Sequence, residues 1–351
     1  MSLEPKKFTV SPSPHFHDPD DTRSCMADVI IALIPALAVG IYFFGWRCLT
    51  MCLISSAACV VFEYFFQLLT HRRVTVYDLS AIVTGILVVL CVPVHIPYWM
   101  VIVADLFAIV VVKQLFGGIG SNFMNPALAG RVFLFAWASW FSAYPATLTT
   151  AGTSQLPIFR NITMVGGVPD VITGATPLAT MKTGTLPLDF SFRDLLLGNV
   201  SGSIGEVSAF ILIIGGLYLV LRGVISPRIP LVYIATVGLL YLIFPPGVGD
   251  RIQWMLYGIL SGGLMLGAIF MATDYATSPT TPLGQIIFGF GCGLLTYVIR
   301  RFGAYNEGVA FSILIMNTFV WSIDKLSAPR RFGSIKRNIF KRKPLEVKKN
   351  G

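Results

Sequence analysis

Residues 26–45 read MADVIIALIPALAVGIYFFG, a run of twenty positions in which Asp28 is the only charged side chain. An α-helix needs ~20 apolar residues to cross the ~30 Å hydrocarbon layer of a bilayer. Because Gly and Pro interrupt several of the apolar runs in this chain, we expect the shortest to be tilted or to be half-helices. The sequence therefore predicts an all-α polytopic membrane protein with about ten transmembrane helices. The nine further runs are residues 49–69, 80–96, 98–115, 124–141, 206–221, 229–245, 252–272, 284–299 and 308–323.

The composition supports this class. Of the 351 residues, 55% are hydrophobic and only 12% are charged, whereas soluble domains carry about 25% charged residues. The net charge of +9 does not indicate a nucleic-acid-binding protein, because ten of the 26 basic residues lie from Lys325 to the end, directly after an apolar run. Such a tail is typical of a cytoplasmic end beside anionic lipid.

The distribution of Lys and Arg predicts the topology. The polar arm at residues 1–24 shows no cleavable signal peptide, so we expect it to stay in the cytoplasm. With that start, 18 basic residues fall on the cytoplasmic side and seven outside, as the positive-inside rule requires. Arg300 and Arg301 lie outside and oppose this bias. The sequence thus predicts that both termini are cytoplasmic.

Five regions follow from this map. They are a cytoplasmic arm (1–24), a first membrane half (25–141), an extracytoplasmic segment (142–205), a second membrane half (206–324) and a basic cytoplasmic tail (325–351).

The two membrane halves share a weak internal repeat. Gly85 and Pro97 are twelve residues apart, and so are Gly267 and Pro279. Since five predicted helices separate the two copies, they would cross the membrane in opposite directions. Inverted repeats with helices broken by Gly or Pro often bind a ligand near the membrane midplane. The alternative is that Gly and Pro are simply frequent in membrane helices.

The sequence lacks the common motifs of soluble redox enzymes. It has no dinucleotide fingerprint after a strand, no P-loop, no H-E-x-x-H and no Cys cluster for an iron–sulfur centre. If the protein carries out redox chemistry, it must therefore use a borrowed organic cofactor.

A segment in the extracytoplasmic region, DVITGATPL at residues 170–178, could hold such a cofactor. Thr173 and Thr176 supply hydroxyl groups, Gly174 and Ala175 allow a bulky group to approach the backbone, and Asp170 adds a carboxylate. A hydroxyl can form a phosphoester, so a flavin nucleotide could be attached covalently through its phosphate. The alternative is an ordinary loop with a Thr-Pro turn.

The segment from Asp170 to Thr176 resembles the flavinylation motif of bacterial respiratory membrane subunits that carry FMN on threonine. Further motifs occur in the matching order, namely SPH at 13–15, NFMNPA at 122–127, TDYATSP at 273–279 and FGAY at 302–305. Together they resemble the family that contains the D subunit of the Rnf electron-transport complex and the B subunit of the sodium-pumping NADH:quinone reductase. The resemblance extends from the arm to about Asp324.

The resemblance implies more than the residues alone indicate. It implies a urea-transporter-like fold of ten helices in two inverted five-helix halves, in a bacterial cell membrane. It also implies covalent FMN on Thr176, attached outside the cytoplasm by a flavin transferase. Partners would be membrane lipid and the other Rnf subunits (A, B, C, E and G). Asn122 and Asn125 match a segment near a non-covalent riboflavin in the quinone reductase, so they are candidates for contact with a second flavin.

Several polar residues within apolar runs or at their ends remain as candidates. Asp105 and Asp274 could belong to an ion path, because an ionisable group at membrane depth is costly and usually functional. The alternatives are a hydrogen bond to a neighbouring helix for Asp105 and a turn for Asp274. Asn125 could equally act as an N-cap before Pro126, as could Asn122.

Two further charged residues, Glu63 and Arg131, also lie within apolar runs. A buried charge is costly unless it is paired, so pairing across helices would account for both.

We therefore interpret the chain as a flavin-carrying subunit of a ferredoxin:NAD oxidoreductase complex that moves Na⁺ or H⁺. It would not be a complete enzyme, since it lacks sites for the soluble donor and acceptor, and the flavin would supply the redox chemistry. The alternatives are a solute channel or transporter, which the repeat would suit, and a structural membrane scaffold.

Overall fold

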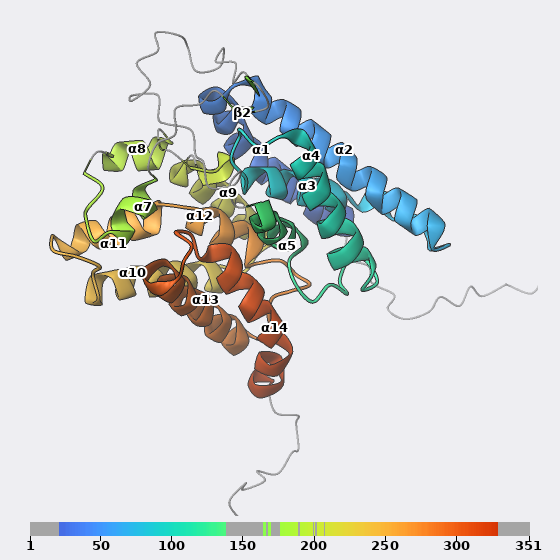
Figure 1. Cartoon of the computed structure of the whole chain (residues 1–351). Helices are drawn as coiled ribbons and strands as arrows, with labels where there is room; N and C mark the ends of the chain where they lie inside the picture. The colour runs from blue at the N-terminus through green and yellow to red at the C-terminus, as the bar shows by residue number, and fades with distance from the viewer. Residues whose placement is uncertain are drawn as a thin grey trace, which may run out of the picture.

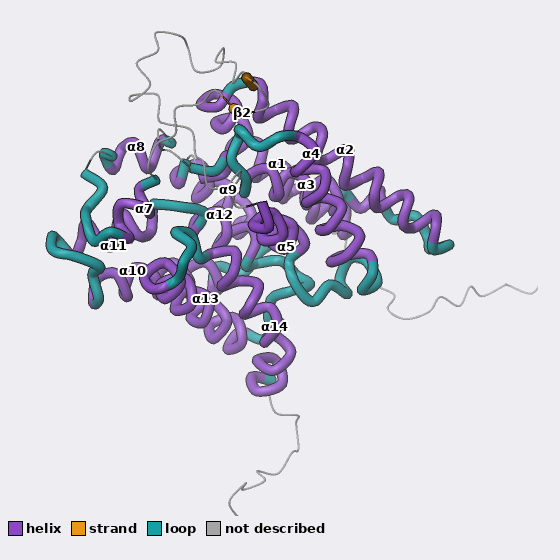
Figure 2. The backbone as a smooth tube through the Cα atoms, in the orientation of Figure 1, coloured by secondary structure: helices purple, strands orange, loops and turns teal. Residues whose placement is uncertain are grey.

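The computed structural model describes residues 21–137, 164–165, 168–169, 176–188, 190–198, 200, 202–206 and 208–328. Within these residues the chain is helical, apart from an antiparallel pair of two-residue strands, β1 (Met164–Val165) and β2 (Val168–Pro169). Figures 1 and 2 show the helices in two groups that follow each other along the sequence.

The first group contains the helices before residue 138. Its elements are α1 (Thr22–Phe44), α2 (Trp46–Leu69), α3 (Ser80–Leu90), α4 (Tyr98–Leu106) and α5 (Pro126–Phe133), with short helices at Val76–Asp78 and Leu134–Trp137. The helix α4 continues directly as a π-helix, η2 (Phe107–Gln114). The helices α3 and α4 both pack on α2.

The second group contains the helices after residue 208. Its elements are α9 (Ala209–Leu221), α10 (Arg228–Ile243), α11 (Arg251–Leu260), α12 (Leu264–Leu266), the π-helix η6 (Gly267–Met271), α13 (Pro282–Phe302) and α14 (Val309–Ser327). Between the groups lie α7 (Pro177–Lys182), α8 (Phe192–Leu197) and the 3₁₀ turn η5 (Ile204–Glu206). Figure 1 shows α7, α8 and α11 together at one end of the molecule.

Four of the described helices, α1, α2, α13 and α14, are long and apolar enough to cross a membrane, and the bent pair α11 and α12–η6 would make a fifth. This supports a polytopic membrane protein. Each of the ten predicted runs contains a helix, but several helices are shorter than predicted, because the chain leaves helical geometry at Pro, Gly and Ser positions.

The third and eighth runs show the breaks most clearly. The third apolar run covers residues 80–96, but α3 ends at Leu90, before Pro93 and Pro97. The eighth, residues 252–272, is bent by 63° between α11 and α12. At this break Gly262 has a φ of +72°, a conformation that glycine adopts without strain. Gly85 and Gly267, the two glycines of the predicted repeat, lie in these two runs.

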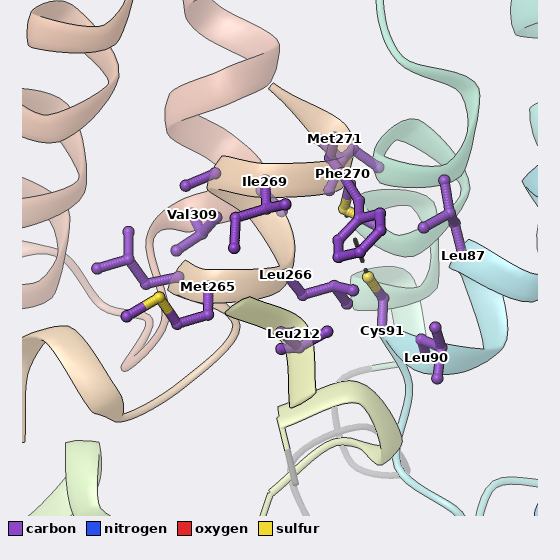
Figure 3. Packing of buried hydrophobic residues seen from close by; sticks show 14 of the residues in the cluster. Leu87, Leu90, Cys91, Leu212, Met265, Leu266, Ile269, Phe270, Met271 and Val309 are labelled. Carbon is purple, nitrogen blue, oxygen red and sulfur yellow. Dashed lines mark hydrogen bonds between the residues drawn. The ribbon is translucent and has the colours of Figure 1, made fainter. Parts of the chain in front are cut away.

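The two groups meet in a core of apolar side chains, where the end of α3 packs against α12 and η6 (Figure 3). The thiol sulfur of Cys91 lies 3.7 Å from the thioether sulfur of Met271. Their neighbours are buried and come from both groups, namely Leu87 and Leu90 from α3, and Leu266 and Phe270 from α12 and η6. Tight apolar packing therefore occupies the centre of the molecule.

Candidate functional site

Thr176 caps the N-terminus of α7. Its backbone is extended, and its Oγ1 accepts a hydrogen bond from the amide of Ala179 at 3.3 Å. The residue is half-buried, while the next two residues, Pro177 and Leu178, are buried. The hydroxyl thus lies at the edge of a packed helix and within reach of solvent. The other predicted residues of this segment (Asp170, Thr173, Gly174 and Ala175) lie outside the described residues.

The helix α7 is held against the membrane helices. Leu178 and Met181 are buried on its inner face, and the Lys182 ammonium donates a hydrogen bond to the carbonyl of Ala304 at 2.9 Å. A side chain at Gly262 would overlap Leu178, because an added Cβ would lie 2.5 Å from its Cδ1. The helix α7 therefore packs against the break between α11 and α12.

A charged cluster surrounds this break. Arg300 donates hydrogen bonds to the carbonyls of Gly258 and Ser261, at 2.6 and 3.1 Å. The Arg131 guanidinium binds both carboxylate oxygens of Glu307, with one of the two contacts at 3.1 Å. The amide of Gly263 donates to the same carboxylate at 3.0 Å. The cluster thus joins α5, α13, the α13–α14 loop and the break.

A second carboxyl group, Glu206, lies beside this cluster. Burial and the neighbouring Glu307 carboxylate raise the pKa of Glu206 to about 8. Arg131 opposes the desolvation of Glu307 and lowers the pKa of that carboxyl below its ordinary value. The pair therefore favours one proton on Glu206 and a negative charge on Glu307.

A cavity of about 460 Å³ opens at the other end of the first group, where α1 begins and α9 ends. Cavities that bind small molecules commonly measure ~300–1,000 Å³. Its walls are mainly apolar and include Val83, Leu87, Leu219 and Phe270. The polar side chains in the walls include Asp21, Thr22, Ser80, Thr84, Lys113, Asn122, Asn125, Thr273, Asp274 and Tyr275.

This cavity brings together three predicted residues that are distant in sequence. The Asn125 side chain accepts hydrogen bonds from the amides of Ala127 and Leu128 at 3.0 and 3.3 Å, and it donates to the carbonyl of Met271 at 3.2 Å. Asn125 is thus the N-cap of α5, which was one of its two predicted roles, the other being contact with a flavin. Its amide has little capacity left for a ligand.

Asn122 and Asp274 occupy other positions on the same wall. The Asn122 amide donates to the carbonyl of Met124 at 3.2 Å. Asp274 lies in a turn, where its carboxylate accepts a hydrogen bond from the Thr277 hydroxyl at 3.2 Å. The predicted turn role of Asp274 is therefore confirmed, and its side chain also lines the cavity.

Asp105 belongs to α4, lies away from the cavity and is fully buried. The hydroxyl of Ser55 donates a hydrogen bond to its Oδ1 at 2.9 Å. The predicted hydrogen bond to a neighbouring helix is thus confirmed. Its Oδ2 has no hydrogen-bond partner.

The charged side chains Glu63 and Arg131 pair across helices, as expected from their positions in apolar runs. Their partners are Lys113 and Glu307 respectively. The sequence did not identify these partners, nor the role of Glu206, because all three lie at the ends of apolar runs, where a charged residue usually faces water. A charge opposite another across the fold leaves no local signal in the sequence.

Comparison with known proteins identifies relatives over nearly the whole chain. The model of the NQR2, RnfD, RnfE family matches residues 9–333. The D subunit of a Na⁺-translocating ferredoxin:NAD⁺ oxidoreductase complex from Acetobacterium woodii is 45% identical over 94% of this chain and 96% of its own length. The D subunit of a proton-translocating complex of the same kind from Clostridium ljungdahlii is 39% identical over 93% and 96%. The D subunit of an ion-translocating oxidoreductase complex from Stutzerimonas stutzeri is 37% identical over 88% and 91%.

Proposed function

The chain belongs to the NQR2, RnfD, RnfE family, and from this premise we propose that it is the D subunit of an ion-translocating ferredoxin:NAD oxidoreductase complex. The observation that carries the proposal is the near full-length match, at 45% identity, to a protein of that name. The chain would act with the other subunits (A, B, C, E and G) and would not be a complete enzyme alone. Its apolar helices would cross a bacterial cell membrane, with both termini in the cytoplasm and the segment before α7 outside.

Covalent FMN on Thr176 forms the first part of the proposal. The hydroxyl lies at the edge of α7 and is half-buried, so the Oγ1–phosphorus bond of a phosphoester could form without unfolding the helix. Leu178 and Met181 would anchor α7, and hence the attachment point, to the membrane helices. A bound flavin would supply one- and two-electron chemistry. A flavin transferase outside the cytoplasm would be required for maturation.

A second, non-covalent flavin in the cavity forms the next part. The volume and the mainly apolar walls suit a flat aromatic ligand. Asn122 uses one amide proton locally and could bind a ring carbonyl or nitrogen. Asn125 would instead shape the wall, because its amide already makes three hydrogen bonds.

Ion movement forms the last part. Asp274 lines the cavity and Asp105 is buried in the first group, so both remain candidates for an ion path. The relatives include a Na⁺-translocating and a proton-translocating complex, so the ion moved by the complex of this chain would be Na⁺ or H⁺.

The alternative function as a solute channel receives no support from the relatives, whose names all describe oxidoreductase complexes. The packed sulfur and apolar side chains at the centre of the molecule also oppose it (Figure 3). A solute on the central path would have to displace buried side chains such as Phe270 and Met271.

The decisive experiment follows flavin fluorescence on a denaturing gel, after the complex is produced together with a flavin transferase. We expect fluorescence to move with this chain, to persist in Thr176→Ser and to disappear in Thr176→Ala. Thr176→Asp is the matched control, because Asp also caps a helix but offers no hydroxyl. Loss of fluorescence in Thr176→Asp with an intact complex assigns the effect to attachment. Fluorescence retained in Thr176→Ala, or a colourless native chain, would refute the proposal.

The cavity is tested separately by counting the flavin released from the native complex upon denaturation. We expect Asn122→Ala to lower the released flavin and to leave the covalent flavin unchanged. Thr84→Val, on the same wall, serves as the control for a general change of the cavity. Equal release from all three proteins would remove the second flavin from the proposal.

A further inference from the structure

A line of buried polar side chains runs along one face of α2. Ser55, Cys59, Glu63 and Gln67 follow each other at intervals of four residues, which places them on the same helix face. All four are at most 5% exposed. The opposite face carries large apolar residues such as Leu53 and Phe65, which are each 61% exposed. We call these four residues the polar stripe.

One end of the polar stripe reaches the cavity. The Lys113 ammonium contacts both carboxylate oxygens of Glu63, at 3.0 and 2.8 Å, and the hydroxyl of Ser80 at 2.6 Å. Both Lys113 and Ser80 line the cavity. Lys113 belongs to the π-helix η2, a type of turn that often occurs at functional sites. The carboxylate of Glu63 is thus one side chain away from the cavity.

Amide groups complete the shell of Glu63. Gln114 and Gln67 donate hydrogen bonds to its Oε1 at 2.7 and 3.3 Å, and Gln67 also donates to the hydroxyl of Thr75 at 2.8 Å. Asp78 is the other charged group that acts on Glu63. The Glu63–Lys113 pair is therefore fully hydrogen-bonded although both side chains are buried.

The other end of the polar stripe reaches Asp105, which is fully buried. The Ser55 hydroxyl contacts both Asp105 Oδ1 and the carbonyl of Gly85, at 2.9 and 3.0 Å, yet it has a single proton to donate. The Oδ2 atom has no hydrogen-bond partner. A buried carboxylate with so few donors is costly, and such a group takes up a proton instead. Cys59 lies on the stripe between Asp105 and Glu63 and interacts with both.

We propose that the polar stripe conducts protons between the cavity and Asp105, which stores a proton inside the membrane domain. A proton from water in the cavity passes through Lys113, Glu63 and the Cys59 thiol to the Asp105 carboxylate, and it leaves by the same route. Each relay group returns to its original charge after the transfer. The carried ion is a proton rather than a metal cation. The oxygen atoms near Asp105, those of the Ser55 hydroxyl and the Gly85 carbonyl, are already within hydrogen-bond distance of each other or of Asp105 and leave no room for a cation between them.

Only the use of the stored proton rests on the proposed function. A proton stored near the cavity would offset the negative charge that arrives when an electron enters a ligand there. The existence of the path depends only on this chain's own residues.

The test uses infrared spectra of the purified, assembled complex at neutral pH. The difference between the native complex and Asp105→Asn should contain a carboxylic-acid carbonyl band, which shifts when H₂O is replaced by D₂O. Lys113→Met and Glu63→Gln should slow this shift at least tenfold. Thr236→Val removes a buried hydroxyl on α10 that lies outside the polar stripe and away from the residues that line the cavity, and it should leave the rate unchanged.

Two results would overturn the proposal. One is a carboxylate band, without the acid band, in the difference spectrum for Asp105. The other is an exchange rate that is the same in the native complex and in the Lys113 and Glu63 variants. If Asp105→Asn does not assemble, Ser55→Ala takes its place, because loss of its hydrogen bond should shift the frequency of the same acid band. The acid band of Asp105 does not depend on flavin. A native complex that shows this band but carries no covalent flavin would therefore refute the flavin proposal and leave the proton path supported.

Discussion

Four charged side chains of the helical core are held in two buried pairs, Glu63–Lys113 and Arg131–Glu307. Replacing a buried pair by apolar residues is often neutral or stabilising, but removing one partner typically costs ~3–5 kcal/mol. Compared with apolar residues in the same positions, the pairs are thus expected to add little to the free energy of unfolding. Both pairs lie next to a candidate site, since Lys113 lines the cavity and Glu307 binds the amide of Gly263 at the break against which α7 packs.

The carboxyl pair of Glu206 and Glu307 predicts a dependence of stability on pH. The raised pKa of Glu206, about 8 against an ordinary 4.5, favours the folded state while this group is protonated. Stability from this source is complete below about pH 4.5 and is lost as the pH rises through about 8. The lowered pKa of Glu307 acts in the opposite direction, since its contribution is lost as the pH falls.

We therefore expect the melting temperature of the complex to fall between about pH 5 and about pH 8, and to fall less in Glu206→Gln. Melting curves followed by tryptophan fluorescence would measure this. Glu307→Gln is the companion variant, because it removes the neighbouring negative charge. In that variant the fall should shift to lower pH, with a general loss of stability because Arg131 loses its ion pair with Glu307. An unchanged slope in Glu206→Gln would contradict the assignment.

At the scale of elements, the helices divide into long spans and broken ones. The positions of the apolar runs were predictable, because they depend on composition over ~20 residues. The break at Ser261–Gly263 was harder to predict, because glycine is frequent in membrane helices and does not by itself mark a break. The π-helical turns in η2 and η6 left no recognisable pattern in the sequence, although η2 places Lys113 beside the cavity.

The contact between α2 and α3 depends on Gly85. A Cβ at this position would lie 2.9 Å from the backbone N and Cα of Ser56, and backbone atoms cannot move aside as a flexible side chain can. Gly85→Ala should therefore separate the two helices and cost about 1–3 kcal/mol. Thermal unfolding of the complex would measure the loss.

The matched control is Gly291→Ala on α13. There an added Cβ would meet the flexible end of the Met316 side chain, which can take another rotamer, so we expect a much smaller loss. Because Gly85→Ala also displaces the carbonyl that Ser55 contacts, it should shift the infrared band assigned to Asp105. Equal losses in the two glycine variants would show that the α2–α3 contact is less tight than the structure indicates.

At the scale of the whole molecule, the sequence motifs were sufficient to predict the family, whereas the placement of the site residues needed the structure. Asn122, Asn125 and Asp274 are up to about 150 residues apart in sequence, and only the fold shows that they share one cavity. The attachment segment was predicted from local residues. Of these, the structure describes Thr176 and shows that it caps a helix seated on the second group.

The orientation of the molecule in the membrane follows from the charge bias and leads to the last prediction. Thr183 follows α7 and is exposed, and His71 follows α2 and is also exposed. The predicted topology places Thr183 outside and His71 in the cytoplasm, because 18 of the basic residues then face inward. Single cysteines at these positions should react differently with a membrane-impermeant reagent added to intact cells.

We expect Thr183→Cys to be labelled in intact cells, and His71→Cys to be labelled only after the membrane is opened. The native cysteines are buried, apart from the partly buried Cys25, so the unmodified chain in intact cells gives the background. The same orientation would place Thr176 within reach of an extracytoplasmic flavin transferase, and the cavity on the side where soluble electron carriers act. Labelling of His71→Cys alone in intact cells would invert the molecule and make flavin attachment at Thr176 by that route impossible.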